Sequence, residues 1–427
     1  MELINYPCKE QWPALLQRPA LDTTHLFDLV SEVIRRVQQG GDEALFELEE
    51  RFDRVKLTSL TVSPEEYTQA ESLVSEELKA AIRMAKHHIE LFHAAQQFES
   101  KRIIPTPGVV CWQKAVPIQR VGLYVPGGTA PLFSTVLMLA VPATIAGCES
   151  IVLCTPPNGE GKVHPAILFA ARLAGVHQVF KVGGAQAIAA MAYGTRSIPA
   201  AYKLFGPGNQ YVTAAKQLVG MHQVAIDMPA GPSEVAVLAD ETAHARLIAA
   251  DLLSQAEHGA DSQALLITTS QTLQQAVALE VERQQEQLPR CQLVAGALAH
   301  SKLIVVHDME EAIALVNAYA PEHLIIQTAD YAAVAERIVN AGSVFLGNYT
   351  PESAGDYASG TNHTLPTNGY ARAFSGVNLD SFIRKITFQE ISRQGLQTLA
   401  PAIEQMAAAE QLEAHRRAVT LRLAKNP

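Results

Sequence analysis

The sequence predicts an α/β protein with two α/β layers of similar size and helical segments at both ends. The chain has 427 residues, which is too many for one hydrophobic core, so two or more domains are expected. From about residue 120, short β-rich runs alternate with helical stretches, and a second set of the same kind follows. Such alternation is typical of parallel sheets that are covered by helices.

The first hundred residues are expected to be helical. Apolar side chains over 26–37 recur with a period near 3.6, and Gly40-Gly41 ends that helix. Asp42 caps a second helix through Phe52, and a longer one is expected over 64–98 with a break near Ser72.

The two alternating sets each supply five expected strands. Those of the first set are 121–125, 150–154, 178–182, 203–205 and 224–227, with helices over 132–146, 165–173, 185–193 and 209–219. Those of the second set are 234–238, 264–268, 303–306, 324–327 and 343–346. Residues 350–378 are irregular and rich in Gly, Ser, Thr, Pro and Asn, and a loop of that length is usually functional or disordered. Residues 380–424 are expected to return to helix.

Composition excludes several classes of protein. The chain is 48% hydrophobic and 18% charged, with a net charge of −10 and no long basic run, which argues against nucleic acid as a partner. Five scattered cysteines form no CxxC pair, so reduced thiols in a cytoplasmic protein are expected. The start of the chain lacks the pattern of a signal peptide, and the longest apolar run, Val136–Gly147, is interrupted by Pro142 and is too short for a membrane span.

Four Gly-rich turns follow expected strands of the first set. They are Val125–Gly128, Val182–Gln186, Phe205–Asn209 and Met228–Ser233. Such turns lie at the carboxyl ends of strands, where open α/β sheets bind ligands and glycine lets backbone N–H groups approach an anion. The competing interpretation is four tight turns without a ligand. None matches GxGxxG, so any dinucleotide binding is expected to be weak and atypical.

Gln255 and His258 lie in a predicted helix end that Gly259 terminates. At about 100° per residue the two side chains lie on the same side, one turn apart, where they can share a metal ion. The competing interpretation is a helix cap beside a surface polar group. Asp356, on the Gly/Ser-rich loop, is a candidate third ligand, or alternatively a turn-forming residue.

Glu322 and His323 immediately precede an expected strand. Imidazole has a pKa that suits proton transfer, and a carboxylate can activate water. The competing interpretation is a loop with two solvated polar residues.

Glu410 and His415 are five residues apart, about 140° around a straight helix. If both residues are functional, either the helix ends between them or they have different roles. The competing interpretation is that both are surface residues of a terminal helix.

Taken together, these stretches resemble the histidinol dehydrogenase family. The matching segments are Val121–Gly128, Val182–Ala187, Phe205–Asn209, Ile226–Glu234, Ser254–Gly259, Pro321–Ile326, Gly342–Gly347, Ser353–His363 and Glu410–His415. They run in the family's order over about residues 20–420. The resemblance implies two doubly wound, incomplete Rossmann-like domains with helical N- and C-terminal extensions.

The resemblance also implies an activity. The family oxidises L-histidinol to L-histidine, the last step of histidine biosynthesis, with two NAD⁺ per substrate and an enzyme-held aldehyde. It binds one Zn²⁺ per subunit and is a homodimer with active sites shared between subunits. The implied zinc ligands are Gln255, His258, Asp356 and His415, the last supplied by the other subunit.

The remaining roles follow from the same motifs. Substrate contacts are implied for Ser233, Gln255, His258, His323, Asp356, Glu410 and His415. Contacts to NAD are implied for Tyr124, Gln186 and Asn209. His323 is expected to be the general base and acid, and Glu322 to activate water. Zinc would hold and orient the imidazole and amine of histidinol.

The implied domains divide the chain into four parts. Residues 1–22 are expected to form an N-terminal extension, and residues 23–120 together with 236–377 a first domain that carries the metal and proton-transfer residues. Residues 121–235 are expected to form a second domain with the NAD turns, and residues 378–427 a helical tail that reaches the partner subunit. Two alternatives remain: a zinc hydrolase with Glu322 or Glu257 as base, and a non-catalytic metal- or nucleotide-binding assembly protein.

Overall fold

The computed structural model describes residues 1–19, 24–127, 131–228 and 231–424. Gly128 of one predicted turn, and Pro229 and Ala230 of another, lie outside the described residues. The chain divides into two compact units, which are described separately. Unit 1 comprises Met1–Ala95 and Ile118–Phe382, and unit 2 comprises Gln96–Pro117 and Ile383–Pro427.

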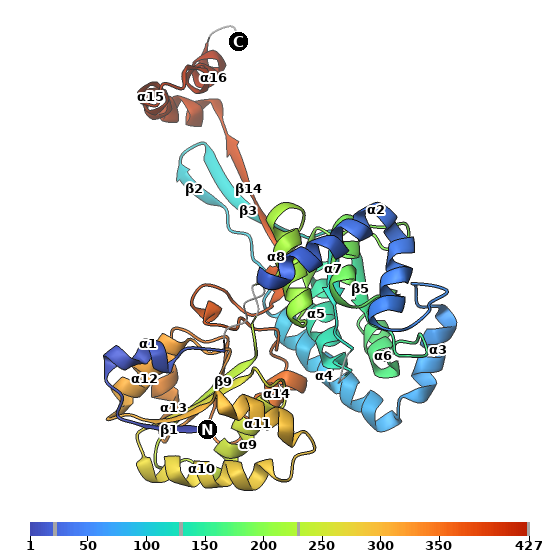
Figure 1. Cartoon of the computed structure of the whole chain (residues 1–427). Coiled ribbons are helices and arrows are strands. Elements are labelled where there is room, and N and C mark those ends of the chain that lie inside the picture. The colour runs from blue at the N-terminus through green and yellow to red at the C-terminus, as the bar shows by residue number, and fades with distance from the viewer. Residues whose placement is uncertain (20–23, 128–130, 229–230, 425–427) are drawn as a thin grey trace. The chain divides into compact units, whose positions relative to one another are not determined.

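Unit 1 contains a six-stranded parallel sheet in the order β1-β11-β10-β9-β12-β13 (Figure 1). The strands are β1 Glu2–Asn5, β9 Glu234–Ala239, β10 Gln263–Thr268, β11 Lys302–Val305, β12 His323–Gln327 and β13 Ser343–Leu346. Every residue of β9, β10 and β12 is buried, as central strands covered on both faces require.

Helices cover both faces of this sheet. Because side chains alternate along a strand, Val235 and Val237 point into one core while Ala236 and Leu238 point into another. The first core also contains residues of α9 (Ala245–Ala256), α10 (Gln271–Gln285) and α11 (Cys291–Ala299). The second contains residues of α1 (Trp12–Leu15), α12 (Met309–Tyr319) and α13 (Tyr331–Ala335).

Unit 1 also contains a five-stranded parallel sheet in the order β6-β5-β4-β7-β8. Its strands are β4 Arg120–Tyr124, β5 Ser150–Thr155, β6 Gln178–Lys181, β7 Lys203–Phe205 and β8 Ala225–Ile226. The helices that connect them are α5 Phe133–Ala146, α6 Pro165–Leu173, α7 Gly184–Tyr193 and α8 Gln210–His222. The ten strands expected from the alternating pattern are all present, so the α/β class is confirmed.

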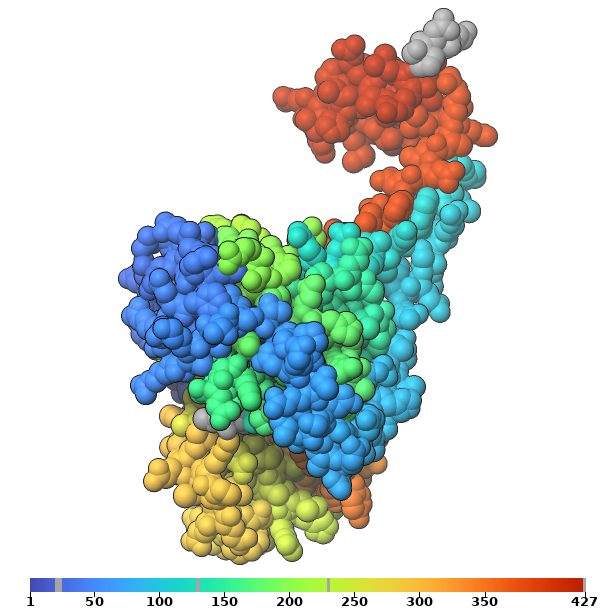
Figure 2. Space-filling view, turned by 90° about the vertical axis from the view of Figure 1, so that its right-hand side faces the viewer, coloured from blue at the N-terminus to red at the C-terminus, as the bar shows by residue number. Residues whose placement is uncertain are grey.

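Three N-terminal helices pack on the five-stranded sheet. α2 (Phe27–Phe52) shares a core with α7 and α8, and α3 (Pro64–Leu73) and α4 (Glu76–Ala94) share one with α5 and α6. In Figure 2 the N-terminal residues of unit 1, in shades of blue, lie on the surface beside the green residues of the five-stranded sheet and its helices. The packing differs from the expected grouping of residues 23–120 with 236–377. An apolar helix face marks burial, but its period does not say which sheet it will meet.

Unit 2 is an antiparallel sheet followed by a helical pair. The sheet has the order β14-β3-β2, with β2 Ile103–Thr106, β3 Val109–Pro117 and β14 Ile383–Ile391. α15 (Arg393–Ala409) packs against α16 (Glu413–Leu423). The expectation of continuous helix over 380–424 is therefore wrong for β14. The segment mixes Ile, Thr and Phe with charged residues without strict alternation, and it gains strand structure by pairing with β3, more than 260 residues earlier.

Shorter elements complete the description. The 3-10 helices are Lys9–Gln11, Thr24–Leu26, Tyr370–Arg372 and Leu379–Phe382. The irregular stretch 350–378 also contains a short α-helix, α14 (Glu352–Tyr357), so Asp356 lies on a helix and not on the expected loop. No helix among the described residues combines the length and the apolar character needed to cross a bilayer. The five cysteines are free thiols, as expected.

Candidate functional site

The proton-transfer candidates lie at the amino edge of the six-stranded sheet. His323 is the first residue of β12 and pairs in register with Val235 of β9 and Ser343 of β13. Glu322 precedes β12, and Ser233 precedes β9. α9 runs back along the sheet, so its carboxyl end brings Gln255 and His258 to the same edge.

His323 lies among carboxyl groups. It is 4% exposed. Its Nδ1 is 3.6 Å from Glu322 Oε2 and 3.9 Å from Glu352 Oε1, and its Nε2 is 3.7 Å from Asp356 Oδ1. Burial lowers the pKa of the imidazole, but the three carboxyl groups outweigh that effect and raise the pKa to about 10. Nδ1 also lies 3.3 Å from the Glu234 carbonyl oxygen.

Glu322 is buried and accepts a hydrogen bond from the Glu234 backbone N–H at 3.0 Å. Burial raises the pKa of its carboxyl to about 7, although the neighbouring imidazole opposes the rise. A carboxyl group with a pKa near neutrality can both accept and release a proton during turnover. The structure thus places two groups of different proton affinity side by side.

Three of the side chains at this edge form a cluster that could hold a cation. Ligand atoms of His258, Glu352 and Asp356 all lie within 4.8 Å of one another. Two of the three, His258 and Asp356, were predicted from the sequence. His258 lies just beyond the end of α9, which the structure places at Ala256 with Glu257 as its cap.

Gln255 occupies the last turn of α9 and is fully buried. Neither its amide oxygen nor its amide nitrogen has a hydrogen-bond partner in the described structure. A buried amide without partners costs about 1–3 kcal/mol, so an external ligand for these atoms is expected. Oxygen and nitrogen donors of the kind gathered here suit Zn²⁺.

Glu352 was missed by the sequence analysis. It is 1% exposed, and neither carboxylate oxygen has a hydrogen-bond partner among the described residues. Burial raises the pKa of Glu352 to about 8. A signal was available, because Glu352 and Asp356 are four residues apart and so lie on one face if the segment is helical. The prediction of a loop there concealed that spacing.

The predicted NAD residues lie at the carboxyl edge of the five-stranded sheet. Tyr124 ends β4, and its hydroxyl accepts a hydrogen bond from the Gly184 N–H at 3.1 Å. Gln186, in the first turn of α7, donates to Glu49 Oε1 at 2.9 Å. Asn209 follows β7 and caps α8 by accepting from Tyr211 N and Val212 N. Tyr124 and Gln186 are buried, whereas Asn209 is exposed.

Glu49 and Asp53 of the α2 end were also missed. The Gly183 N–H donates to Glu49 Oε1 at 3.1 Å, and Gln186 Nε2 lies 3.5 Å from Asp53 Oδ2. Burial and the Asp53 charge raise the pKa of Glu49 to about 8. The N-terminus of α7, a place where a phosphate is favoured in many nucleotide-binding folds, is thus already occupied by a carboxyl group.

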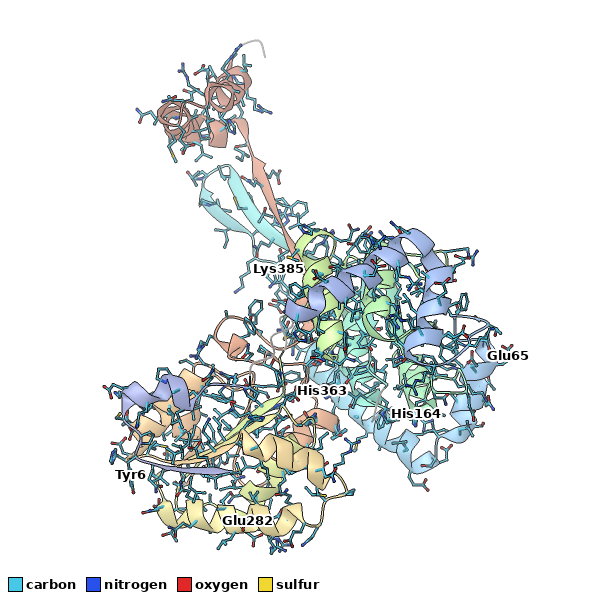
Figure 3. The ribbon with its side chains drawn as sticks, viewed as in Figure 1. Tyr6, Glu65, His164, Glu282, His363 and Lys385 are labelled. Atoms are coloured by element: carbon cyan, nitrogen blue, oxygen red, sulfur yellow. The ribbon has the colours of Figure 1, made fainter. Side chains whose placement is uncertain are left out.

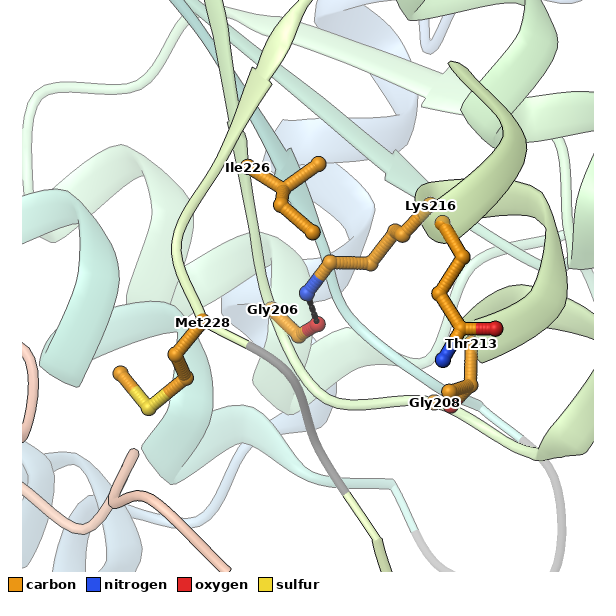
Figure 4. Close-up of a pocket in the computed structure, with 7 residues that line it drawn as sticks. Gly206, Gly208, Thr213, Lys216, Ile226 and Met228 are labelled. Carbon is orange, nitrogen blue, oxygen red and sulfur yellow. Dashed lines mark hydrogen bonds between the residues drawn. The ribbon is translucent and has the colours of Figure 1, made fainter. Parts of the chain in front are cut away.

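The turn after β7 makes a shallow pocket beside β4. Gly206 has φ +122°, and a Cβ there would lie 2.0 Å from the Tyr124 carbonyl oxygen, so only glycine fits. Lys216 donates to the Gly206 carbonyl at 2.9 Å (Figure 4). Lys216 also forms an ion pair with Asp227. The pocket is lined by Gly206, Gly208, Thr213, Lys216, Gln217, Ile226 and Met228.

His363 connects residues of the irregular stretch to α5. Its Nε2 lies 3.1 Å from Thr135 Oγ1, and its Nδ1 lies 2.9 Å from the Asp356 carbonyl oxygen (His363 is labelled in Figure 3). The ring therefore fixes the backbone of the residue that carries one of the candidate ligands. Burial lowers the pKa of His363, which favours the neutral ring that such contacts need.

Glu410 and His415 belong to unit 2. Glu410 caps α15, Gln411 has φ +60°, and His415 lies in the first turn of α16. The helix therefore ends between them, as one of the two interpretations of their spacing required. Both side chains are exposed within unit 2.

Comparisons with known proteins give one consistent result. Residues 16–423 match the family model described as histidinol dehydrogenase. Histidinol dehydrogenases of Bacteroides thetaiotaomicron and Bacteroides fragilis are 66% and 67% identical over 423 residues, 99% of each chain. A crystal structure of histidinol dehydrogenase from Elizabethkingia anophelis matches with a TM-score of 0.97 and 53% identity, over 99% of this chain and 98% of that one.

Proposed function

Because this chain belongs to the histidinol dehydrogenase family, we propose that it oxidises L-histidinol to L-histidine through L-histidinal, with NAD⁺ and one Zn²⁺ per subunit. Family membership favours an oxidoreductase over the hydrolase and the non-catalytic binding protein. The observation that carries the proposal is the sheet edge where the buried Glu322, His323 and Gln255 come together with the half-buried Asp356 and the exposed His258.

The residues at this edge fit a divalent cation. The unpartnered amide of Gln255 and the clustered donors of His258 and Asp356 would hold it, with His415 of a second subunit as the fourth ligand. When bound, Zn²⁺ would anchor the imidazole and amine of histidinol, and NAD⁺ would accept a hydride in each of the two oxidations. Glu352 lies close enough to serve as a further ligand or as a neighbour of the bound substrate.

A pKa of about 10 keeps the free His323 ring protonated, so His323 would first pass a proton to the neighbouring Glu322 carboxylate and would then take the proton from the alcohol in the first oxidation. Glu322, once it has released its proton to solvent, would take a proton from the water that adds to the aldehyde carbon, while His323 returns its proton to the carbonyl oxygen to give the hydrate. The hydrate would then lose a hydroxyl proton to the neutral His323 in the second oxidation. The two oxidations together release two hydrides and consume one water. The 3.6 Å separation of the two groups lets protons pass between them while the aldehyde stays bound.

The remaining proposed contacts, to substrate and to NAD, come from the same family motifs. Ser233, beside the start of β9, and Glu410 of the second subunit would contact substrate. Tyr124, Gln186 and Asn209 would line the NAD site at the other sheet. A homodimer is supported by the apolar side chains that unit 2 exposes, among them Ile104, Met406 and Leu421. A cytoplasmic location stays a prediction.

NADH yield per histidinol tests the proposal. Two NADH per histidinol are expected from the family reaction, and a chelator should abolish the yield until Zn²⁺ is restored. A yield of one would contradict the four-electron oxidation. Full activity after complete, verified removal of metal would contradict the metal site while leaving the oxidation itself intact.

A further inference from the structure

A buried ion pair lies behind the proton-transfer residues. The guanidinium of Arg18 makes two hydrogen bonds to the Glu234 carboxylate, from Nε to Oε2 and from Nη2 to Oε1, the latter at 2.9 Å. The two side chains are 13% and 2% exposed. The guanidinium also lies 4.0 Å from the centroid of the Tyr319 ring. The planar, two-pronged contact is one that arginine makes and lysine cannot.

The same guanidinium holds the turn that leads into β12. Arg18 Nη2 donates to the Tyr319 carbonyl at 2.7 Å and lies 3.3 Å from the Ala320 carbonyl. Ala320 has a left-handed conformation with φ +55°, which is uncommon for a residue with a Cβ. Pro321, Glu322 and His323 follow directly. Arg18 therefore ties the start of β9 to the entrance of β12.

The backbone of Glu234 contacts both proton-transfer residues. Its backbone N–H donates to Glu322 Oε2 at 3.0 Å, and its carbonyl oxygen lies 3.3 Å from His323 Nδ1. The Tyr319 hydroxyl also contacts the Glu234 carboxylate, since it lies 3.3 Å from Glu234 Oε2. The same hydroxyl donates to Gln263 Oε1 at 2.8 Å. One residue of β9 thus orients Glu322 and His323 through its backbone while Arg18 fixes its side chain.

We propose that Arg18 is a positioning residue for the Glu322–His323 pair, acting through Glu234 and through the carbonyls of Tyr319 and Ala320. The inference rests on the proposed function, because it assumes that Glu322 and His323 handle protons. Within the described part of the chain, the hydrogen bonds of Arg18 go to Glu234, Tyr319 and Ala320 and not to Glu322 or His323, so its effect on the reaction is indirect. The arrangement assigns a role in turnover to the N-terminal segment, which none of the sequence motifs includes.

Steady-state kinetics of Arg18→Met, Arg18→Lys and Glu322→Gln, each with histidinol and with histidinal as substrate, test the proposal. Arg18→Met should lower kcat by about tenfold or more, because a small displacement of a proton-transfer group is enough to slow turnover. KM for histidinol and for NAD⁺ should stay within about threefold of the wild type. Arg18→Lys keeps the charge and should recover part of kcat.

Two further variants separate positioning from folding. Arg18→Met/Glu234→Gln leaves no unpaired charge buried, so it should fold and still show the lowered kcat, because the carbonyl contacts of Arg18 remain lost. Arg337→Met removes the exposed Arg337–Glu310 pair, whose side chains are 45% and 70% exposed, and should behave as the wild type. The melting temperature of each variant identifies any that is unfolded.

The outcomes distinguish this inference from the proposed function. Wild-type kcat in a folded Arg18→Met protein, a change confined to KM, or full recovery in the double variant would each overturn the positioning role. If Glu322→Gln slows histidinol and histidinal oxidation equally, the division of labour between Glu322 and His323 is wrong. Arg18→Met should even then lower kcat with both substrates, because it displaces both groups.

Discussion

At the residue scale, the burial of Gln255 is the feature that most needs a ligand. Both of its amide atoms lack partners in the described structure, although the side chain is fully buried. A second buried glutamine, Gln274, shows the usual solution, since its amide nitrogen donates to the carbonyls of Ile4 and Leu303. The contrast between the two supports the proposal that Gln255 is a metal ligand.

The contrast gives a prediction. Without metal, Gln255→Leu should stabilise the protein by about 1–3 kcal/mol, because it removes two unpaired polar atoms. It should also abolish the rise in melting temperature that Zn²⁺ gives the wild type. Gln274→Leu is the matched control and should destabilise the protein with and without Zn²⁺. Thermal unfolding with and without a chelator measures both effects, and an unchanged response of Gln255→Leu to Zn²⁺ would exclude this residue as a ligand.

Glu49 is a second residue whose burial has a measurable consequence. Burial and Asp53 raise the pKa of Glu49 from 4.5 to about 8, so the folded protein favours the protonated carboxyl. The stability that this preference gives is fully present below pH 4.5 and is lost as the pH rises towards 8. The wild type should therefore lose stability relative to Glu49→Gln over that interval.

Chemical unfolding of wild type and Glu49→Gln across this pH range measures the difference. Glutamine keeps an oxygen for the Gly183 N–H and cannot ionise, so the variant isolates the charge. Glu47→Gln is a suitable control, because Glu47 lies on the same helix with an exposed side chain. A pH-independent difference between wild type and Glu49→Gln would show that Glu49 titrates normally.

At the element scale, the two sets of candidate residues lie at opposite edges of two sheets. The NAD candidates follow the carboxyl ends of β4, β6 and β7, where open α/β sheets usually bind ligands. Glu322, His323 and Ser233 instead precede β12 and β9, at the amino edge of the other sheet. The carboxyl end of α9 and the short helix α14 complete that edge, so residues from four elements meet around His323.

In the turn between β7 and α8, the backbone of Gly206 approaches the backbone of Tyr124 at the end of β4. Gly206→Ala should destabilise the protein by at least about 2 kcal/mol, because a Cβ would meet the Tyr124 carbonyl oxygen at 2.0 Å and the backbone has φ +122°. Gly159→Ala is the control, since nothing lies within 4 Å of its added Cβ, and should be nearly neutral. Denaturant unfolding compares them, and equal stabilities would refute the close approach.

At the scale of the whole molecule, we propose that a second subunit completes the zinc site. Glu410 and His415 lie in unit 2, in two helices that a left-handed Gln411 separates. The ligands predicted in unit 1 are Gln255, His258 and Asp356, which leaves a fourth position for His415 of a partner. A homodimer with symmetric exchange of unit 2 would complete two such sites.

Mixed dimers test this exchange. Heterodimers of His258→Asn and His415→Asn subunits should have about half the wild-type activity, because one of the two sites keeps all its ligands. Heterodimers of wild type with a subunit carrying both substitutions should be nearly inactive, since each site then lacks one ligand. If each subunit supplied its own His415, the two results would be reversed, and activity of purified, tagged heterodimers distinguishes them.

The class of fold and most residues of the candidate site could be predicted from the amino-acid sequence. Hydrophobic period and turn residues are local, so ten strands and the main helices could be predicted from them. Ordered motifs led to Glu322, His323, Gln255, His258 and Asp356, which the structure gathers at one edge. The sequence could not predict β14, because its strand structure depends on pairing with the distant β3.

Tertiary structure decided which sheet α2 to α4 would cover and which buried groups would lack partners. Glu352 and Glu49 resemble ordinary surface glutamates in the sequence, and only packing removes them from water and raises their pKa values. Arg18 likewise gains its role from Glu234, which is 216 residues away in the chain. Contacts of this kind depend on how distant segments fold together, and no local pattern of residue types contains them.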